Sequence, residues 1–134
     1  MSTETVHAEW VRDEVFLLKD HFDFPLVMTQ PQGVNGADLL PLSLIGCAGW
    51  DVIAILKKQH QQVTGLEVSA ESQRDEAPPW RFRRILIHYR LRGRNLVTER
   101  VKRAIDLAET KYCSVYATLR DAVEIQSEFE IVNE

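Results

Sequence analysis

Two cysteines are the residues best suited to do chemistry in this 134-residue sequence. Cys47 lies in the almost wholly apolar stretch SLIGCAGWDVIAILKK, and Cys113 lies in ETKYCSVYATLRD. A thiolate can attack a peroxide and become a sulfenic acid, and a second thiol can condense with that sulfenic acid to a disulfide. Free cysteines are more often small, buried and inert, so composition alone favours two structural thiols. Both interpretations of the pair stay open at this point.

Other chemical motifs are missing from the sequence. Neither cysteine belongs to a CxxC pair, so we expect no metal site. The sequence has no dinucleotide-binding glycine motif, phosphate-binding loop or nucleophile elbow, so we expect no cofactor. The histidines are scattered without the short spacing of metal ligands; they are His7, His21, His60 and His88.

A basic run raises the question of nucleic-acid binding. No stacking aromatic residues alternate with these arginines, and the net charge is -4, which argues against nucleic acid and anionic lipid as partners. Glutamates on neighbouring strands can pair with the arginines across an exposed sheet face instead. The arginines are Arg81, Arg83, Arg84, Arg90, Arg92 and Arg94, and the glutamates are Glu67, Glu71, Glu124, Glu128 and Glu130.

The stretch from Leu39 to Leu56 has 18 residues and one charge, which is long enough to raise the question of a membrane span. Asp51, Pro41 and the two glycines Gly46 and Gly49 argue against a span, and no second such segment follows. We therefore expect a buried central helix and no membrane partner. The first ten residues, MSTETVHAEW, lack the features of an export signal, so we expect a cytoplasmic, reducing location without a structural disulfide.

Strands and helices alternate along the sequence, which predicts one α+β domain over residues 1–134. Residues 66–71 and 85–91 alternate apolar and polar side chains and predict a hairpin. The other expected elements are strands within 5–20, at 24–29 and at 123–132, and helices at 38–61 and 98–111.

The neighbours of the two cysteines predict different environments. Ser114 is a plausible cap for a short helix over 115–121, which would place Cys113 just before a helix N-terminus, where a thiolate is favoured. Asp51 lies one helical turn beyond Cys47, where a carboxylate opposes a thiolate unless a cation is near.

Two longer motifs carry a family resemblance. LIGCAGWDVIAILKK and VKRAIDLAETKYCSVYATL resemble the two cysteine motifs of the OsmC/Ohr family, in its general OsmC-like branch, and the resemblance extends from about Trp10 to Ile131. It implies an OsmC-like α+β fold with antiparallel sheets packed on long central helices, in an intertwined homodimer. It also implies a thiol-dependent peroxidase for organic hydroperoxides, in which Cys47 attacks, Cys113 resolves and an external dithiol, such as a lipoyl-type one, reduces the disulfide.

The activating residues of the family match this sequence only in part. The family's glutamate lies ten residues before the first cysteine, where this sequence has Ala37, and Asp38 is the partial substitute one residue later. Arg12 is the candidate for the family's arginine. The alternative is a non-catalytic dimeric domain that binds an apolar ligand in the interface pocket.

Overall fold

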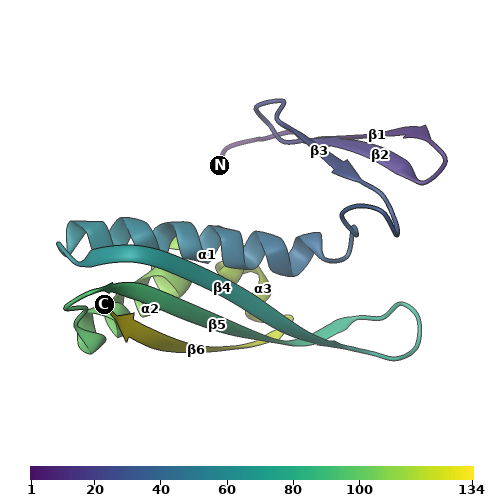
Figure 1. The fold of residues 1–134 in the computed structure, drawn as a ribbon. Helices are drawn as coiled ribbons and strands as arrows, with labels where there is room; N and C mark the ends of the chain where they lie inside the picture. The colour runs from purple at the N-terminus through teal and green to yellow at the C-terminus, as the bar shows by residue number, and fades with distance from the viewer. The chain divides into compact units, whose positions relative to one another are not determined.

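The computed structural model describes residues 1–134, which form two compact units, Met1–Leu40 and Pro41–Glu134. Figure 1 shows the elements of both units. The expectation of a single domain stays a prediction.

The first unit is a three-stranded antiparallel sheet in the order β1-β2-β3. Its strands are β1 (His7–Arg12), β2 (Val15–Lys19) and β3 (Pro25–Met28), close to the expected segments. A small sheet of this kind needs a further surface to cover its apolar side chains. Several large ones are exposed in this unit: Trp10, Val11, Phe22, Phe24, Leu26 and Val27.

Helix α1 (Leu39–Lys58) has Pro41 in its first turn, where the missing backbone N–H costs no helical hydrogen bond. It is long and apolar enough to cross a membrane by length and composition, which is weak evidence because core helices pass the same test. One side is fully buried through Leu44, Ala48, Val52 and Leu56, which recur every four residues. The expectation that the helix is enclosed on most sides is wrong for a single chain, because Trp50 on another side is 79% exposed.

The second unit contains the sheet β4-β5-β6, formed by β4 (Gln62–Arg74), β5 (Phe82–Arg94) and β6 (Glu124–Asn133). The predicted β4–β5 hairpin is confirmed. Within the α+β class, the expected antiparallel arrangement is wrong for β6, which pairs parallel to β5. The physical reason is the helical crossover between them, which returns the chain to the same end of the sheet.

The crossover consists of α2 (Thr98–Leu107), the π-helix η1 (Ala108–Tyr112) and α3 (Ser114–Leu119). The helix predicted at 98–111 corresponds to α2 and η1 together, which end at Tyr112. Its last turn is π-helical. The N-cap of α2 is Val97, which makes no side-chain capping hydrogen bond.

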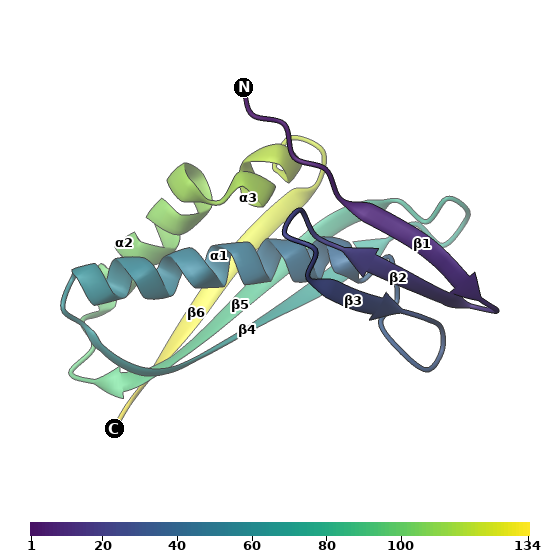
Figure 2. The ribbon, with the colours of Figure 1, turned by 90° about the horizontal axis from the view of Figure 1, so that it is seen from above.

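The two faces of this sheet have opposite character. Helices α1, α2 and α3 lie against the same face, which we call the inner face (Figures 1 and 2). Its central strand contributes the fully buried residues Ile85, Ile87, Tyr89 and Leu91. On the outer face Arg90 lies 3.9 Å from Glu67 and 3.4 Å from Glu130. Arg84 likewise lies 3.8 Å from Glu124, so the expected cross-strand pairing is confirmed for these two arginines of the basic run, whereas Arg83 pairs with Asp75.

Candidate thiol site

Both cysteines lie in the unit Pro41–Glu134 and come together there. Cys47 is half-buried in the middle of α1, and Cys113 is only 2% exposed between η1 and α3. Their side chains are close enough for each thiol to affect the other electrostatically. Two residues 66 positions apart in the sequence are thus neighbours because α1 and the crossover pack on one sheet face.

The backbone around Cys113 changes direction at that residue. The amide of Cys113 donates to the carbonyl of Ala108 at 2.8 Å and closes the last π-helical turn. Its backbone then becomes extended, with φ -80 and ψ 107, and α3 begins at the next residue. The thiol sulfur accepts a hydrogen bond from the amide of Tyr116 at 3.4 Å. Cys113 itself is therefore the N-cap of α3, and the prediction that Ser114 caps this helix is wrong by one residue.

Cys113 is held as a neutral thiol. Burial, together with the hydrogen bond to Cys47, raises the pKa of Cys113 to about 11. The amides of Tyr116 and Val115 at the start of α3 lower this pKa but do not overcome the burial. The expected position before a helix N-terminus, where a thiolate is favoured, is therefore confirmed, but burial outweighs its effect on the pKa of Cys113.

A buried carboxyl group lies on the π-helical turn before Cys113. Glu109 is 7% exposed, and its Oε2 accepts from the hydroxyl of Tyr89 at 2.8 Å and of Ser127 at 2.5 Å. Burial is the main cause that raises the pKa of Glu109, and the two hydrogen bonds only partly offset it. Burial first, and then the charge and the hydrogen bond of Glu109, raise the pKa of Tyr89.

The cluster formed by Tyr89, Glu109 and Ser127 was not foreseen from the sequence. A signal was present, because Glu109 follows the buried Val101 and Ile105 at four-residue spacing. A carboxylate in that register must lie on the apolar face of the helix and needs hydrogen-bond donors.

The two predicted activating residues belong to the other unit. Arg12 is exposed at the end of β1, and Asp38 is exposed just before α1. Their part in the site stays a prediction. Within the second unit, Asp51 is half-buried one turn beyond Cys47 and has no ion pair.

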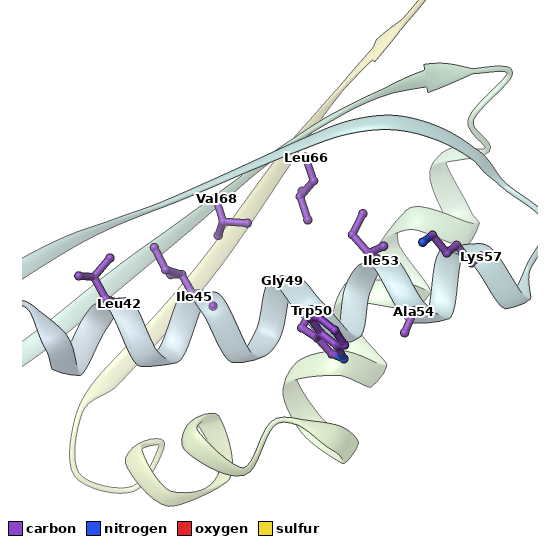
Figure 3. A pocket seen from close by; sticks show the side chains of 10 residues that line it. Leu42, Ile45, Gly49, Trp50, Ile53, Ala54, Lys57, Leu66 and Val68 are labelled. Atoms are coloured by element: carbon purple, nitrogen blue, oxygen red, sulfur yellow. The ribbon is translucent and has the colours of Figure 1, made fainter. Parts of the chain in front are cut away.

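A separate apolar groove of about 780 Å³ runs between α1 and β4. Figure 3 shows its side chains from both elements. Gly49 forms its floor, where an added Cβ would lie 3.3 Å from Val68, so the small residue lets the helix approach the strand. Neither thiol lines the groove. Its lining is Leu42, Ile45, Gly46, Gly49, Trp50, Ile53, Ala54, Lys57, Leu66 and Val68.

The sequence matches a family model described as OsmC-like protein over residues 29–128, a range that includes both cysteines. The chain belongs to the OsmC-like protein family. It is also 35% identical over 128 residues to Protein YhfA of Escherichia coli K12, covering 93% of this chain and 96% of that relative.

Solved structures share the fold of this OsmC-like chain. A hypothetical protein from Aquifex aeolicus VF5 is similar with a TM-score of 0.90 and 28% identity, covering 100% of this chain and 99% of its own. The organic hydroperoxide resistance protein OhrB of Bacillus subtilis is similar with a TM-score of 0.63 and 17% identity, covering 96% of this chain and 98% of its own. The latter likeness shows the fold alone.

Proposed function

We propose that this protein is a thiol-dependent peroxidase that reduces organic hydroperoxides through a cycle of Cys47 and Cys113. The observation that carries the proposal is the interaction of the two thiol side chains in a chain of the OsmC-like family. The name of the structural relative OhrB, an organic hydroperoxide resistance protein, supports the choice of substrate class.

The cycle has three balanced steps. The thiolate of Cys47 attacks the O–O bond of the hydroperoxide, and with one proton it gives a sulfenic acid and an alcohol. The thiol of Cys113 then condenses with this sulfenic acid to give the disulfide and water. An external dithiol, for which we propose a lipoyl-type molecule, reduces the disulfide and is itself oxidised.

The environment of Cys113 suits the resolving role. A thiol with a pKa of about 11 is a poor first nucleophile near neutral pH. It keeps its proton and lies beside Cys47, so it is already in place when the sulfenic acid forms. The assignment of Cys47 as the attacking residue rests on the family motif and on its greater exposure, since Cys47 is half-buried and Cys113 is buried.

We further propose that the working form is a cytoplasmic homodimer in which a second copy covers the groove between α1 and β4. The exposed Trp50, the apolar groove and the exposed apolar residues of the first unit supply a large surface that one chain leaves uncovered. Obligate dimers bury about 2,000 Å² or more. Arg12 and Asp38 remain the candidates for activating Cys47 in that assembly.

The assembly makes a direct prediction. Trp50→Glu places a charge in the apolar surface that the second copy would cover, so we expect monomers at micromolar concentration. Glu99→Gln, on exposed α2, is the control and should leave the dimer unchanged. Sedimentation analysis distinguishes the two states. A wild-type monomer under these conditions would reject the dimer proposal.

A second candidate function is binding of an apolar ligand without catalysis. The groove of about 780 Å³ favours it, because its volume lies in the usual range for small-molecule sites. A binding protein would consume hydroperoxide once per thiol pair and then stop.

Turnover with excess reductant separates the two functions. The assay mixes cumene hydroperoxide with dihydrolipoamide and compares wild type, Cys47→Ser and Cys113→Ser. We expect multiple turnovers for wild type, no oxidation of Cys47→Ser, and a single oxidation of Cys113→Ser that stops at a trappable sulfenic acid on Cys47. Loss of the first oxidation in Cys113→Ser alone would reverse the two roles.

A further inference from the structure

The π-helical turn before Cys113 has a specific anchor. In η1, Glu109 is the residue whose carboxyl group is buried and bonded to the sheet. Its Oε2 bonds to Tyr89 on β5 and to Ser127 on β6, two neighbouring strands of the inner face. One oxygen atom thus ties the turn to two strands at once.

The anchor acts on the segment that sets the position of Cys113. A π-helical turn is a rare conformation that occurs mostly as a single turn, often at functional sites. In η1 it ends with the bond from the amide of Cys113 to the carbonyl of Ala108. Relaxing the turn by one residue to α-helical geometry would rotate the following residue by roughly 100° about the helix axis. Cys113 would then leave Cys47.

Burying the carboxyl group of Glu109 costs free energy of folding, which argues for a role beyond packing. A carboxyl group on the inner face loses hydration, and burial accordingly raises the pKa of Glu109. An apolar residue at this position would avoid that cost but could not bond to Tyr89 and Ser127. The carboxyl group also lines a second cavity of about 560 Å³, together with the exposed Lys102 and Arg103 of α2.

We propose that Glu109 is a positioning residue for the thiol pair, holding Cys113 against Cys47 by fixing the π-helical turn to β5 and β6. The proposal rests on the two-thiol cycle proposed above. It concerns how the chain brings the sulfurs together and assigns no contact between Glu109 and the hydroperoxide.

The decisive measurement is the equilibrium of the Cys47–Cys113 disulfide with a dithiothreitol redox buffer, followed by mass after acid quenching. In this exchange two electrons and two protons pass between dithiothreitol and the protein thiols, so no peroxide is required. We expect Glu109→Ala to lower the equilibrium constant for disulfide formation at least tenfold, which corresponds to about 30 mV. Glu109→Gln keeps an acceptor oxygen for Tyr89 and Ser127 and should stay within about threefold of wild type.

Two controls separate positioning from general damage. Glu99→Ala removes an exposed carboxylate that lines the same cavity and should leave the equilibrium unchanged. If Glu109→Ala fails to fold, the double variant Tyr89→Phe and Ser127→Ala removes both donors instead, and the same loss is expected. A folded variant of either kind with the wild-type equilibrium constant would overturn the proposal.

Failure of this inference differs from failure of the proposed function. A wild type that forms the disulfide in the buffer but never turns over cumene hydroperoxide would reject the peroxidase and leave the positioning role intact. A wild type that turns over hydroperoxide while Glu109→Ala keeps its disulfide equilibrium would reject the positioning role alone. Wild type that forms no Cys47–Cys113 disulfide in the oxidised buffer would reject both.

Discussion

Glutamates lie on both faces of the sheet β4-β5-β6, but their surroundings differ. On the outer face, glutamates that are more than half exposed pair with His88 and Arg90, whose side chains are still more than a third exposed. On the inner face a single glutamate, Glu109, is buried and held by two hydroxyl groups beside the thiol pair. Exposed pairs contribute little to stability, whereas a buried polar group is costly to leave without a partner.

The largest expected difference between the faces is in stability. Tyr89→Ala removes a fully buried aromatic ring from the inner face and one hydrogen bond from Glu109, so we expect a loss of about 3–5 kcal/mol in the free energy of unfolding. Arg84→Ala removes an outer-face pair with Glu124 at 3.8 Å and should cost less than about 1 kcal/mol. Urea denaturation at matched protein concentrations measures both. Equal losses would contradict the distinction between the faces.

The second expected effect concerns the rate at which the disulfide forms. Because burial holds the pKa of Cys113 at about 11, its thiolate fraction at pH 7 is about 10⁻⁴. The attacking species in disulfide formation is the thiolate, so the resolving rate should rise about tenfold per pH unit between pH 7 and pH 10. Rapid-quench mass analysis after one equivalent of cumene hydroperoxide follows this step. A rate that stays level above pH 8 would show that Cys113 is not buried in this way when it reacts.

The sequence predicted the parts of this arrangement that depend on local pattern. Alternation fixed the β4–β5 hairpin and identified which side of β5 is apolar, and the glutamates opposite the arginines followed from it. The parallel pairing of β6 was missed because alternation is the same in both strand directions. The π-helical turn was missed because a capping residue such as Ser114 indicates where a helix begins but does not indicate whether the preceding turn is α-helical or π-helical. The buried carboxyl group of Glu109 was missed with it.

The sequence also predicted part of the candidate site, namely which two residues form the thiol pair. The positions of both cysteines within motifs drew attention to them, and the structure brings their side chains together. The sequence indicated the helix N-terminus that lowers the pKa of Cys113, but it did not indicate the burial that outweighs it, because burial depends on tertiary packing.

The third prediction concerns how the contribution of Glu109 to stability depends on pH. The folded pKa of Glu109 is raised above its ordinary value of 4.5, so its stabilising contribution is complete below about that pH and is lost as pH rises through the folded pKa. The groups that face it are Tyr89 and Ser127 from the strands, Asp106 from its own helix and Tyr116 from α3.

Glu109→Gln does not ionise and should lose less stability than wild type as pH rises from 4.5 to 8. Thermal denaturation across this range measures the difference. We expect the melting temperature of Glu109→Gln minus that of wild type to increase as the pH rises. Glu99→Gln controls for a general change in surface charge, and a constant difference between Glu109→Gln and wild type would show that the carboxyl group does not titrate in this range.

The smallest expected effect lies on the outer face, at His88. Its pKa is raised above 6.5, mainly by the hydrogen bond to Glu130 and further by Glu128, while partial desolvation opposes the shift. Because the folded pKa is raised, the contribution is present below pH 6.5 and is lost as pH rises through the folded pKa, the same direction as for Glu109. Salt distinguishes the two sites. Ions screen exposed pairs strongly and buried groups weakly, so 1 M NaCl should remove most of the pH-dependent difference between wild type and His88→Asn while leaving that of Glu109→Gln. If salt abolished both differences equally, Glu109 would have to be as accessible to solvent as the outer face, and the contrast between the two faces would be lost.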